Sequence, residues 1–236
     1  MTVRVDLNAD LGEGFGVWSL GDDEAMLGIV TSANLACGFH AGDPAALRRV
    51  CGQAGAAGVR IGAQVGYRDL AGFGRRYIDV AADDLVADVI YQIGALQALA
   101  RSAGTAVTYV KPHGALYNVA ARDRDVAQAI ADGVKAWRGN DVILVGLAGS
   151  SMLDVFRQAG FPVWGEAFAD RAYEADGTLR ARSKAGALIE VPEAAAEQAL
   201  RLAARGDVQT ICVHSDTPGS TAIARAVRLA VDKLVK

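Results

Sequence analysis

The stretch that decides the fold is residues 81–114, "AADDLVADVIYQIGALQALARSAGTAVTYVKPHG". Its apolar side chains at positions 85, 86, 89, 90, 93 and 96 recur near helical spacing and predict a long helix over 81–104. The short run 107–112, rich in valine, follows almost at once and predicts a strand that is buried on both faces. A helix followed by such a strand is typical of proteins built around a parallel sheet.

The same alternation continues along the whole chain. Further strands are predicted at 3–8, 29–36, 59–65, 141–148, 162–168 and 209–214. Further helices are predicted at 43–58, 123–138, 150–160, 192–205 and 218–235, with a long irregular loop at 66–80. Seven strands alternating with helices indicate one α/β domain over residues 1–236, with a parallel sheet that is either doubly wound or closed into a barrel.

The composition narrows the class of protein. Hydrophobic residues make up 52% of the 236 residues and the formal net charge is −3, so the chain has material for a full core and no charge signal for nucleic acid or a membrane surface. The first residues lack the basic and apolar segments of a secretory signal. We therefore expect a cytoplasmic protein in which Cys37, Cys51 and Cys212 are reduced core thiols.

Polar side chains gather where the predicted strands end. Parallel α/β folds bind their ligands at the carboxyl ends of the strands. All three histidines of the chain lie at or just beyond such ends. The full set at these ends is Asp6, Asn8, Asp10, Glu13, His40, Gln64, Tyr67, Arg68, Asp69, Lys111, His113, Glu166, Asp170, Arg171, His214, Ser215 and Asp216.

Several of these residues also have simpler explanations. Asp10 could stabilise the turn that follows it, and His40 could hydrogen-bond within the glycine turn 38–42. Asp216 could be the N-cap of the next helix. Arg75 and Arg76, in the "GFGRR" segment, could be surface charges, or they could bind a carboxylate or phosphate in bidentate fashion.

The residue types point to hydrolysis of an amide or ester. Carboxylates beside neutral histidine suit general acid–base attack of water, and a lysine or arginine would stabilise the developing oxyanion. The same aspartate and histidine side chains could instead hold a divalent metal. The chain lacks a Gly-x-Ser-x-Gly elbow and a Gly-x-x-x-x-Gly-Lys-[Ser/Thr] phosphate loop, and "GEGFGV" at 12–17 lacks the third glycine of a dinucleotide fingerprint.

A series of motifs resembles one family. In order they are "DLNADLGEGFG", "SANLACGFHAGDP", "GFGRR", "YQIGAL", "VKPHGALYN", "GLAGS", "FADRAY" and "VHSDTPG", and they run from about residue 4 to the end. Together they look like the LamB/YcsF family, the A subunits of ATP-dependent 5-oxoprolinase. The resemblance implies a seven-stranded parallel β/α barrel similar to those of the glycoside hydrolase/deacetylase superfamily.

The resemblance also implies an activity and partners. The lactam of 5-oxoproline (pyroglutamate) would be opened to L-glutamate with cleavage of ATP, together with B and C subunits. Because this chain has no recognisable phosphate loop, we expect ATP to be bound with or by the partner subunits. The partners would phosphorylate the lactam oxygen, and this chain would bind and hydrolyse the activated ring. A homo-oligomer is also compatible with the sequence.

The resemblance and the chemistry suggest roles for single residues. Asp10, with Asp6 close by, would orient or deprotonate water, and Lys111 would stabilise the oxyanion or the leaving phosphate. His113 would act as the acid at the ring nitrogen, with His40 and His214 completing the pocket. Arg75, Arg76 or Arg171 would hold the substrate carboxylate; the other expected substrate-binding residues are Asn8, Glu13, Gln64, Asp170 and Asp216.

The chain departs from its relatives at three places. Many relatives read Ala-His-Pro where this chain reads "AQV", so Gln64 replaces a histidine and is a poorer ligand for a transition metal. Ser215 stands where relatives usually have glycine, and the segment before Thr210 is short. We therefore predict no metal ligands, and interpret His40 first as a substrate-positioning or proton-handling group. The alternatives are a stand-alone metal-dependent deacetylase or amidase of the same fold and a non-catalytic binding subunit.

Overall fold

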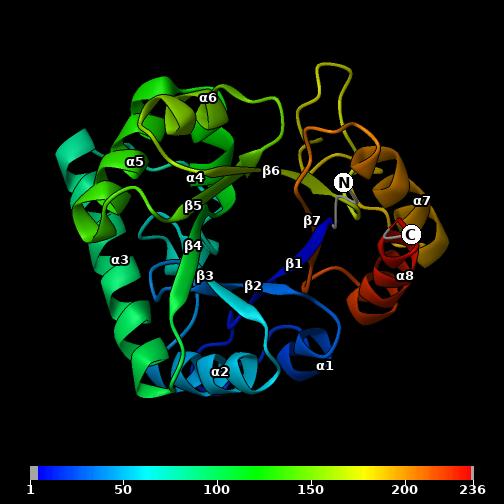
Figure 1. Cartoon of the computed structure of the whole chain (residues 1–236), viewed down its shortest axis with the longest axis horizontal. Helices are drawn as coiled ribbons and strands as arrows, with labels where there is room; N and C mark the ends of the chain where they lie inside the picture. The colour runs from blue at the N-terminus through cyan, green and yellow to red at the C-terminus, as the bar shows by residue number, and fades with distance from the viewer. Residues whose placement is uncertain (1–4, 235–236) are drawn as a thin grey trace.

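Seven parallel strands close into a barrel in the computed structural model, which describes residues 5–234 (Figure 1). Strand β1 pairs with both β2 and β7, which closes the sheet. The predicted seven-stranded parallel barrel is therefore confirmed, and the doubly wound alternative is wrong. The strands are β1 Asp6–Leu11, β2 Ser32–Ala36, β3 Arg60–Val65, β4 Val107–Pro112, β5 Ile143–Leu147, β6 Val163–Phe168 and β7 Thr210–His214.

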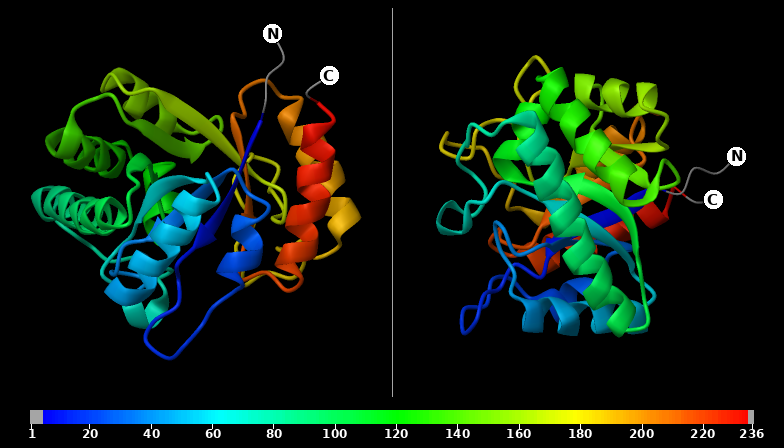
Figure 2. Two further views of the ribbon diagram at one scale, coloured as in Figure 1. Left: turned by 60° about the horizontal axis from the view of Figure 1, so that its bottom comes forward. Right: turned by 90° about the vertical axis from the view of Figure 1, so that its left-hand side faces the viewer.

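Helices cover the outside of the barrel, with α3 beside α5 and α7 beside α8 (Figure 2). The six predicted helices are present, and the described residues add two short ones, α1 and α4. These two have one to two turns, too short to show a hydrophobic period. The helices are α1 Asp23–Leu27, α2 Pro44–Ala56, α3 Ala82–Ser102, α4 Gly114–Ala120, α5 Arg124–Arg138, α6 Ser151–Gln158, α7 Pro192–Ala203 and α8 Ser220–Asp232. No helix among residues 5–234 is long and apolar enough to cross a membrane.

Strand β1 is the largest departure from the predicted boundaries. The prediction placed it at 3–8, of which residues 3 and 4 lie outside the described chain, whereas the strand spans Asp6–Leu11. Its sequence "DLNADL" alternates polar and apolar side chains, and all six residues are buried. Successive side chains of a strand point to opposite faces, so one face of β1 carries carboxylates and an amide while the other is apolar. A search for apolar runs misses such a strand.

The barrel interior is closely packed around Tyr109 of β4. This side chain is 1% exposed, and its hydroxyl donates a 2.7 Å hydrogen bond to Asn34 Oδ1 of β2. Gly62 of β3 leaves the room that the ring needs, because a Cβ at that position would lie 2.0 Å from the ring. Cores of this density do not absorb an extra methyl group without strain.

We expect Gly62→Ala to lower the free energy of unfolding by about 2–3 kcal/mol, at the upper end of overpacking effects. Urea unfolding followed by circular dichroism measures the change. Gly94→Ala is the matched control: Gly94 lies inside α3 with nothing within 4 Å of the place a Cβ would take, so alanine there should leave stability unchanged or raise it by about 1 kcal/mol. An equal loss of stability in both variants would contradict the packing argument.

Two long loops reach over the carboxyl ends of the strands. Residues 66–80 form the predicted irregular loop, with one 3₁₀ turn at Leu70–Gly72. A second loop, residues 169–191, joins β6 to α7 and contributes several residues to the pocket described below. The three cysteines are buried and free, as predicted.

Candidate active site

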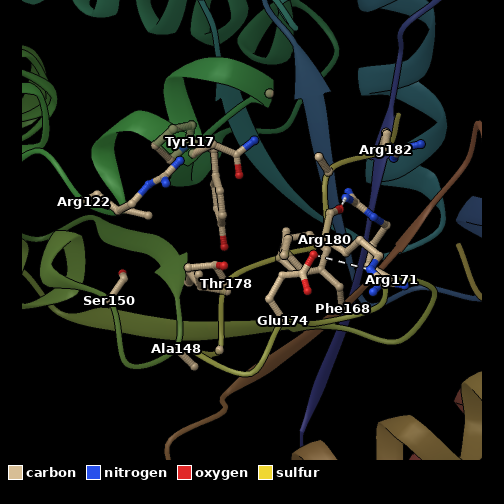
Figure 3. A pocket seen from close by; sticks show the side chains of 18 of the residues that line it. Tyr117, Arg122, Ala148, Ser150, Phe168, Arg171, Glu174, Thr178, Arg180 and Arg182 are labelled. Carbon is tan, nitrogen blue, oxygen red and sulfur yellow. Dashed lines mark hydrogen bonds and ion pairs between the residues drawn. The ribbon is translucent and has the colours of Figure 1, made fainter. Parts of the chain in front are cut away.

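A pocket of about 910 Å³ opens at the carboxyl ends of the strands (Figure 3). Strand ends supply Asp10, Lys111, Phe168 and His214 to its wall, while the loop 169–191 supplies its outer part. This is the end at which parallel barrels place their active sites. The volume suits a ligand larger than a single small ring.

Lys111 lies at the centre of the inner pocket. Its Nζ is 2.7 Å from Glu166 Oε1, 3.1 Å from Asp10 Oδ1 and 3.4 Å from Cys212 Sγ. Burial disfavours the charged ammonium, but the nearby carboxylates outweigh it and hold the pKa of Lys111 well above its usual value. The reverse effect holds the pKa of Asp10 well below its usual range despite burial. The inner pocket thus contains a fixed ammonium between two carboxylates.

Asp10 is held in place from the barrel interior. Asn34 Nδ2 donates to Asp10 Oδ1 at 2.8 Å and to Asn8 Oδ1 at 2.7 Å, while Asn34 Oδ1 accepts from the Tyr109 hydroxyl. The sequence reasoning missed Asn34 and Tyr109. They were hidden inside predicted strands, and only the register that pairs Asp10 with Asn34 brings them to the site.

His40 and His113 form a stacked pair beside this centre. Their rings lie 3.9 Å apart between centroids and 9° from parallel. Burial lowers the pKa of both imidazoles, that of His113 to about 4, so both are neutral near pH 7. His113 Nε2 lies 3.0 Å from the carbonyl oxygen of Phe73, which only accepts, so Nε2 carries the proton and Nδ1 is an acceptor.

Glu13 lies beside both imidazoles of this pair. Its Oε1 is 3.9 Å from His113 Nδ1 and 4.0 Å from His40 Nε2. Burial, reinforced by the negative charges of Asp10 and Asp216, raises the pKa of Glu13 well above its usual value. Glu13 therefore retains its proton at a pH where an exposed glutamate has lost it.

We expect Glu13→Gln to change how stability depends on pH. The raised pKa in the folded protein means that stability is fully present below the ordinary value of 4.5 and is lost as pH rises through the folded-state value. Glutamine mimics the protonated carboxyl, so the variant should lack this loss and be more stable than the wild type at pH 7. Urea unfolding from pH 4 to pH 8 measures both slopes. Glu197→Gln, at an exposed position, is the control. Identical slopes for all three proteins would show that folding does not raise the pKa of Glu13.

His214 is oriented by Asp170. Its Nδ1 lies 3.0 and 3.1 Å from the two carboxylate oxygens, so Nδ1 carries the proton and Nε2 is left as an acceptor. Asp170 is fully buried and also accepts from the Thr217 hydroxyl and the His214 backbone N–H. Asp170 is absent from the pocket wall, so the prediction that it contacts substrate is wrong: it is a positioning residue for His214.

Asp6 lies at the wrong end of the barrel for the role predicted from the sequence. Because β1 begins at Asp6, this carboxylate is two inward positions below Asp10. It pairs with Arg60 at 2.7 Å and accepts from the hydroxyls of Thr31, Ser32 and Thr210. The prediction that Asp6 lies close to Asp10 and shares its chemistry is therefore wrong.

The remaining predicted residues divide between the site and its surroundings. Asn8 lies in the layer between Asp6 and Asp10, and Gln64 Oε1 is 3.3 Å from His40 Nε2, so both support the site from behind. Arg76 pairs with Asp69 within its own loop, its side chain is 65% exposed, and it does not line the pocket.

Asp216 lies at the rim of the pocket. It pairs with Arg75 and, at 3.3 Å, with Arg182. The N-cap of α8 is Gly219, so the alternative that Asp216 caps this helix is wrong. Arg182 was missed, although the length of the segment between the last two strands was a usable signal.

Two groups of side chains approach metal-ligand spacing in the described chain. Asp10, Cys212 and His214 form one, but the Lys111 ammonium contacts both Asp10 and Cys212 and takes the place of a cation. Glu13, His40 and His113 form the other. There the two imidazole planes are nearly parallel, so their in-plane lone pairs do not converge on one point. As arranged, neither donor set fits a metal ion.

The fold and the site together define a β/α-barrel protein with a buried acid–base pocket at the carboxyl ends of its strands. Residues 5–234 match the model of the LamB/YcsF family, and the chain belongs to that family. It is 57% identical to the A subunit of 5-oxoprolinase from Mycobacterium avium, over 95% of this chain and 93% of that relative.

Solved structures agree with this assignment. A lactam utilization protein from Thermus thermophilus is 43% identical, with a TM-score of 0.90 over 98% of this chain and 96% of that one. A putative cellobiose-phosphate cleavage protein from Enterococcus faecalis is 12% identical, with a TM-score of 0.56 over 99% of this chain and 95% of that one. This second likeness shows the shared fold alone.

Proposed function

We propose that this chain is the lactam-hydrolysing subunit of an ATP-dependent 5-oxoprolinase that works with B and C subunits. The observation that carries the proposal is the buried Lys111 ammonium between Asp10 and Glu166, beside an oriented histidine. Relatives more than half identical carry the name of the A subunit of 5-oxoprolinase, which supports the substrate and the existence of partner subunits.

Attack of water on the ring carbon is the first task of the site. Asp10 stays ionised and is a weak base, so its role is to orient the water. His214 Nε2 accepts the proton, because Asp170 fixes the other ring nitrogen as the donor. Lys111 lies beside the phosphorylated oxygen and stabilises the negative charge that develops there when phosphate leaves.

Release of the ring nitrogen is the second task, and it needs a proton. His113 lines the pocket, and burial raises the pKa of Glu13 behind it well above its usual value, which makes this carboxyl group a proton donor. This pair supplies the proton as the carbon–nitrogen bond breaks. Arg75, at the rim, is placed to bind the substrate carboxylate.

Activation of the lactam is assigned to the partner subunits. They transfer the terminal phosphoryl group of ATP to the lactam oxygen, which makes the ring carbon a better electrophile. On this chain, water adds to that carbon, the carbon–nitrogen bond breaks, and the phosphorylated carboxyl group loses phosphate to a second water. The products are L-glutamate, ADP and phosphate.

The test is release of L-glutamate from 5-oxoproline and ATP. We expect the chain alone to release none and the chain with B and C subunits to release glutamate and phosphate in equal amounts. Release by the B and C subunits without this chain would make it a binding subunit. Release by the chain alone, abolished by a chelator, would make it a metal-dependent amidase.

A further inference from the structure

The outer part of the pocket carries more positive charge than the chain neutralises. Seven cationic side chains line it: Arg75, Arg122, Arg171, Arg180, Arg182, Lys184 and Arg205. Within residues 5–234 their ion-pair partners are three carboxylates: Glu174 for Arg180 and Lys184, Asp216 for Arg75 and Arg182, and Asp207 for Arg205. The acidic side chains in the outer wall itself are Glu174 and Asp176. This excess is local, because the whole chain has a formal net charge of −3.

Arg171 is the most informative of these side chains. It is only 7% exposed, and the structure gives it no carboxylate partner among the described residues. One of its Nη atoms donates to the Arg180 carbonyl oxygen at 2.7 Å, whereas its Nε is buried without a hydrogen-bond partner. A buried guanidinium with an unused donor is costly unless a ligand completes it. Burial and the positive charge of the neighbouring Arg182 lower the pKa of Arg171 to about 10. This is the direction expected for a buried cation that has no ion-pair partner.

A second guanidinium faces this group from the other wall. Figure 3 shows Arg122 on the α4 side of the pocket, and Arg171, Arg180 and Arg182 across from it. Ser150 lines the pocket on the side of Arg122, and its hydroxyl oxygen is buried without a partner. Guanidinium groups and a hydroxyl around one space match the tetrahedral oxygens of a phosphoryl group.

We propose that this outer part of the pocket is a phosphate subsite, anchored by Arg171 and closed by Arg122, for the phosphoryl group of an activated lactam. The inference rests on the proposed function, because it names the form in which the substrate reaches this chain: a ring that carries both a carboxylate and a phosphate. Arg75, which pairs with Asp216 through one of its Nη atoms, lies at the rim for the carboxylate, and Lys111 lies where the phosphorylated oxygen would meet the inner pocket. The pocket volume of about 910 Å³ leaves room for both anionic groups.

The test is calorimetric titration of the purified full chain with inorganic phosphate at physiological ionic strength. We expect saturable binding that Arg171→Gln weakens at least tenfold, the effect of losing one charge-assisted hydrogen bond of about 1.5 kcal/mol. Arg171→Lys keeps the positive charge but loses the paired N–H donors of the guanidinium group, so it should weaken phosphate binding less than Arg171→Gln does. Arg122→Gln should weaken it several-fold, and this exposed residue can be changed without risk to the fold. Arg101→Gln, an exposed arginine in the last turn of α3, is the control and should bind phosphate as the wild type does.

The outcomes separate the subsite from the proposed function. Absence of phosphate binding, or binding that Arg171→Lys and Arg122→Gln leave unchanged, overturns the subsite. A parallel titration with ATP and with adenosine identifies which phosphate compound the subsite binds. If ATP binds and adenosine competes with it, the arginines belong to a nucleotide site, and the proposal of a subsite for the lactam phosphate is overturned. Glutamate release by the complete complex is measured separately. If phosphate binds as expected and no glutamate is released, the proposed function fails while the phosphate site stands.

Discussion

Replacing Lys111 with methionine should lower the kcat of the complete 5-oxoprolinase complex by about 100- to 1,000-fold, the range seen when one oxyanion-stabilising group is lost. KM for 5-oxoproline should change far less, because the ammonium acts on charge that develops during the reaction. Steady-state release of glutamate measures both parameters. Lys135→Met, an exposed lysine on α5, is the matched control and should be as active as the wild type.

The same substitution should also destabilise the fold. It leaves the carboxylates of Asp10 and Glu166 buried without their cation, a change that costs about 3–5 kcal/mol. The loss should shrink at low pH: the pKa of Asp10 is depressed in the folded wild type, so the stability from this pair is present above the ordinary value of 3.8 and is lost as pH falls below it. Urea unfolding at pH 7 and at about pH 2 checks this. Full activity in Lys111→Met would refute the assigned role.

The second large effect is expected for Asp170→Asn. An asparagine side chain can offer its amide group to His214 Nδ1, which favours the tautomer that protonates Nε2 and removes the proton acceptor from the pocket. We expect kcat to fall by about 100- to 10,000-fold, the usual range for general acid–base catalysis and its orientation. The measurement is the pH dependence of kcat for the complete complex.

The pH profile distinguishes orientation from simple loss of structure. In Asp170→Asn the profile should change shape, because the proton acceptor of the pocket is replaced, whereas a merely destabilised enzyme would keep the shape at lower amplitude. Thr217→Val is a graded comparison, because it removes one 2.8 Å hydrogen bond to Asp170 and leaves the hydrogen bond between Asp170 and His214 Nδ1 intact. An unchanged profile in Asp170→Asn would assign the proton transfer to another group.

The outline of the fold was predictable from the sequence. Strands such as 107–112 and 209–214 are short apolar runs that need no tertiary information, and their alternation with helices indicates the parallel sheet. Barrel closure is different: periodicity alone left two topologies open, and the family resemblance favoured the barrel. The start of β1 was placed too early because its inward-facing residues are polar.

Part of the site could be predicted because the carboxyl ends of parallel strands meet in space. Lys111, His113 and His214 line the pocket for this reason. Contacts between side chains of different strands could not be predicted from the sequence. The pairing of β1 with β2 brings Asn34 next to Asp10, and the Asp170 side chain contacts His214 instead of facing the pocket. The arginines of the loop 169–191 were missed because no period or motif places side chains in an irregular segment.

Strand β1 links assembly of the barrel to assembly of the site. A shift of one residue in its pairing would turn Asp6 and Asp10 toward the helices and bring leucines into the barrel. Arg60 would then lose its carboxylate partner and Lys111 one of its two, at opposite ends of the strand. A chain with this shifted pairing would therefore be much less stable as well as inactive. The charged side chains proposed for catalysis thus also favour the correct register of β1.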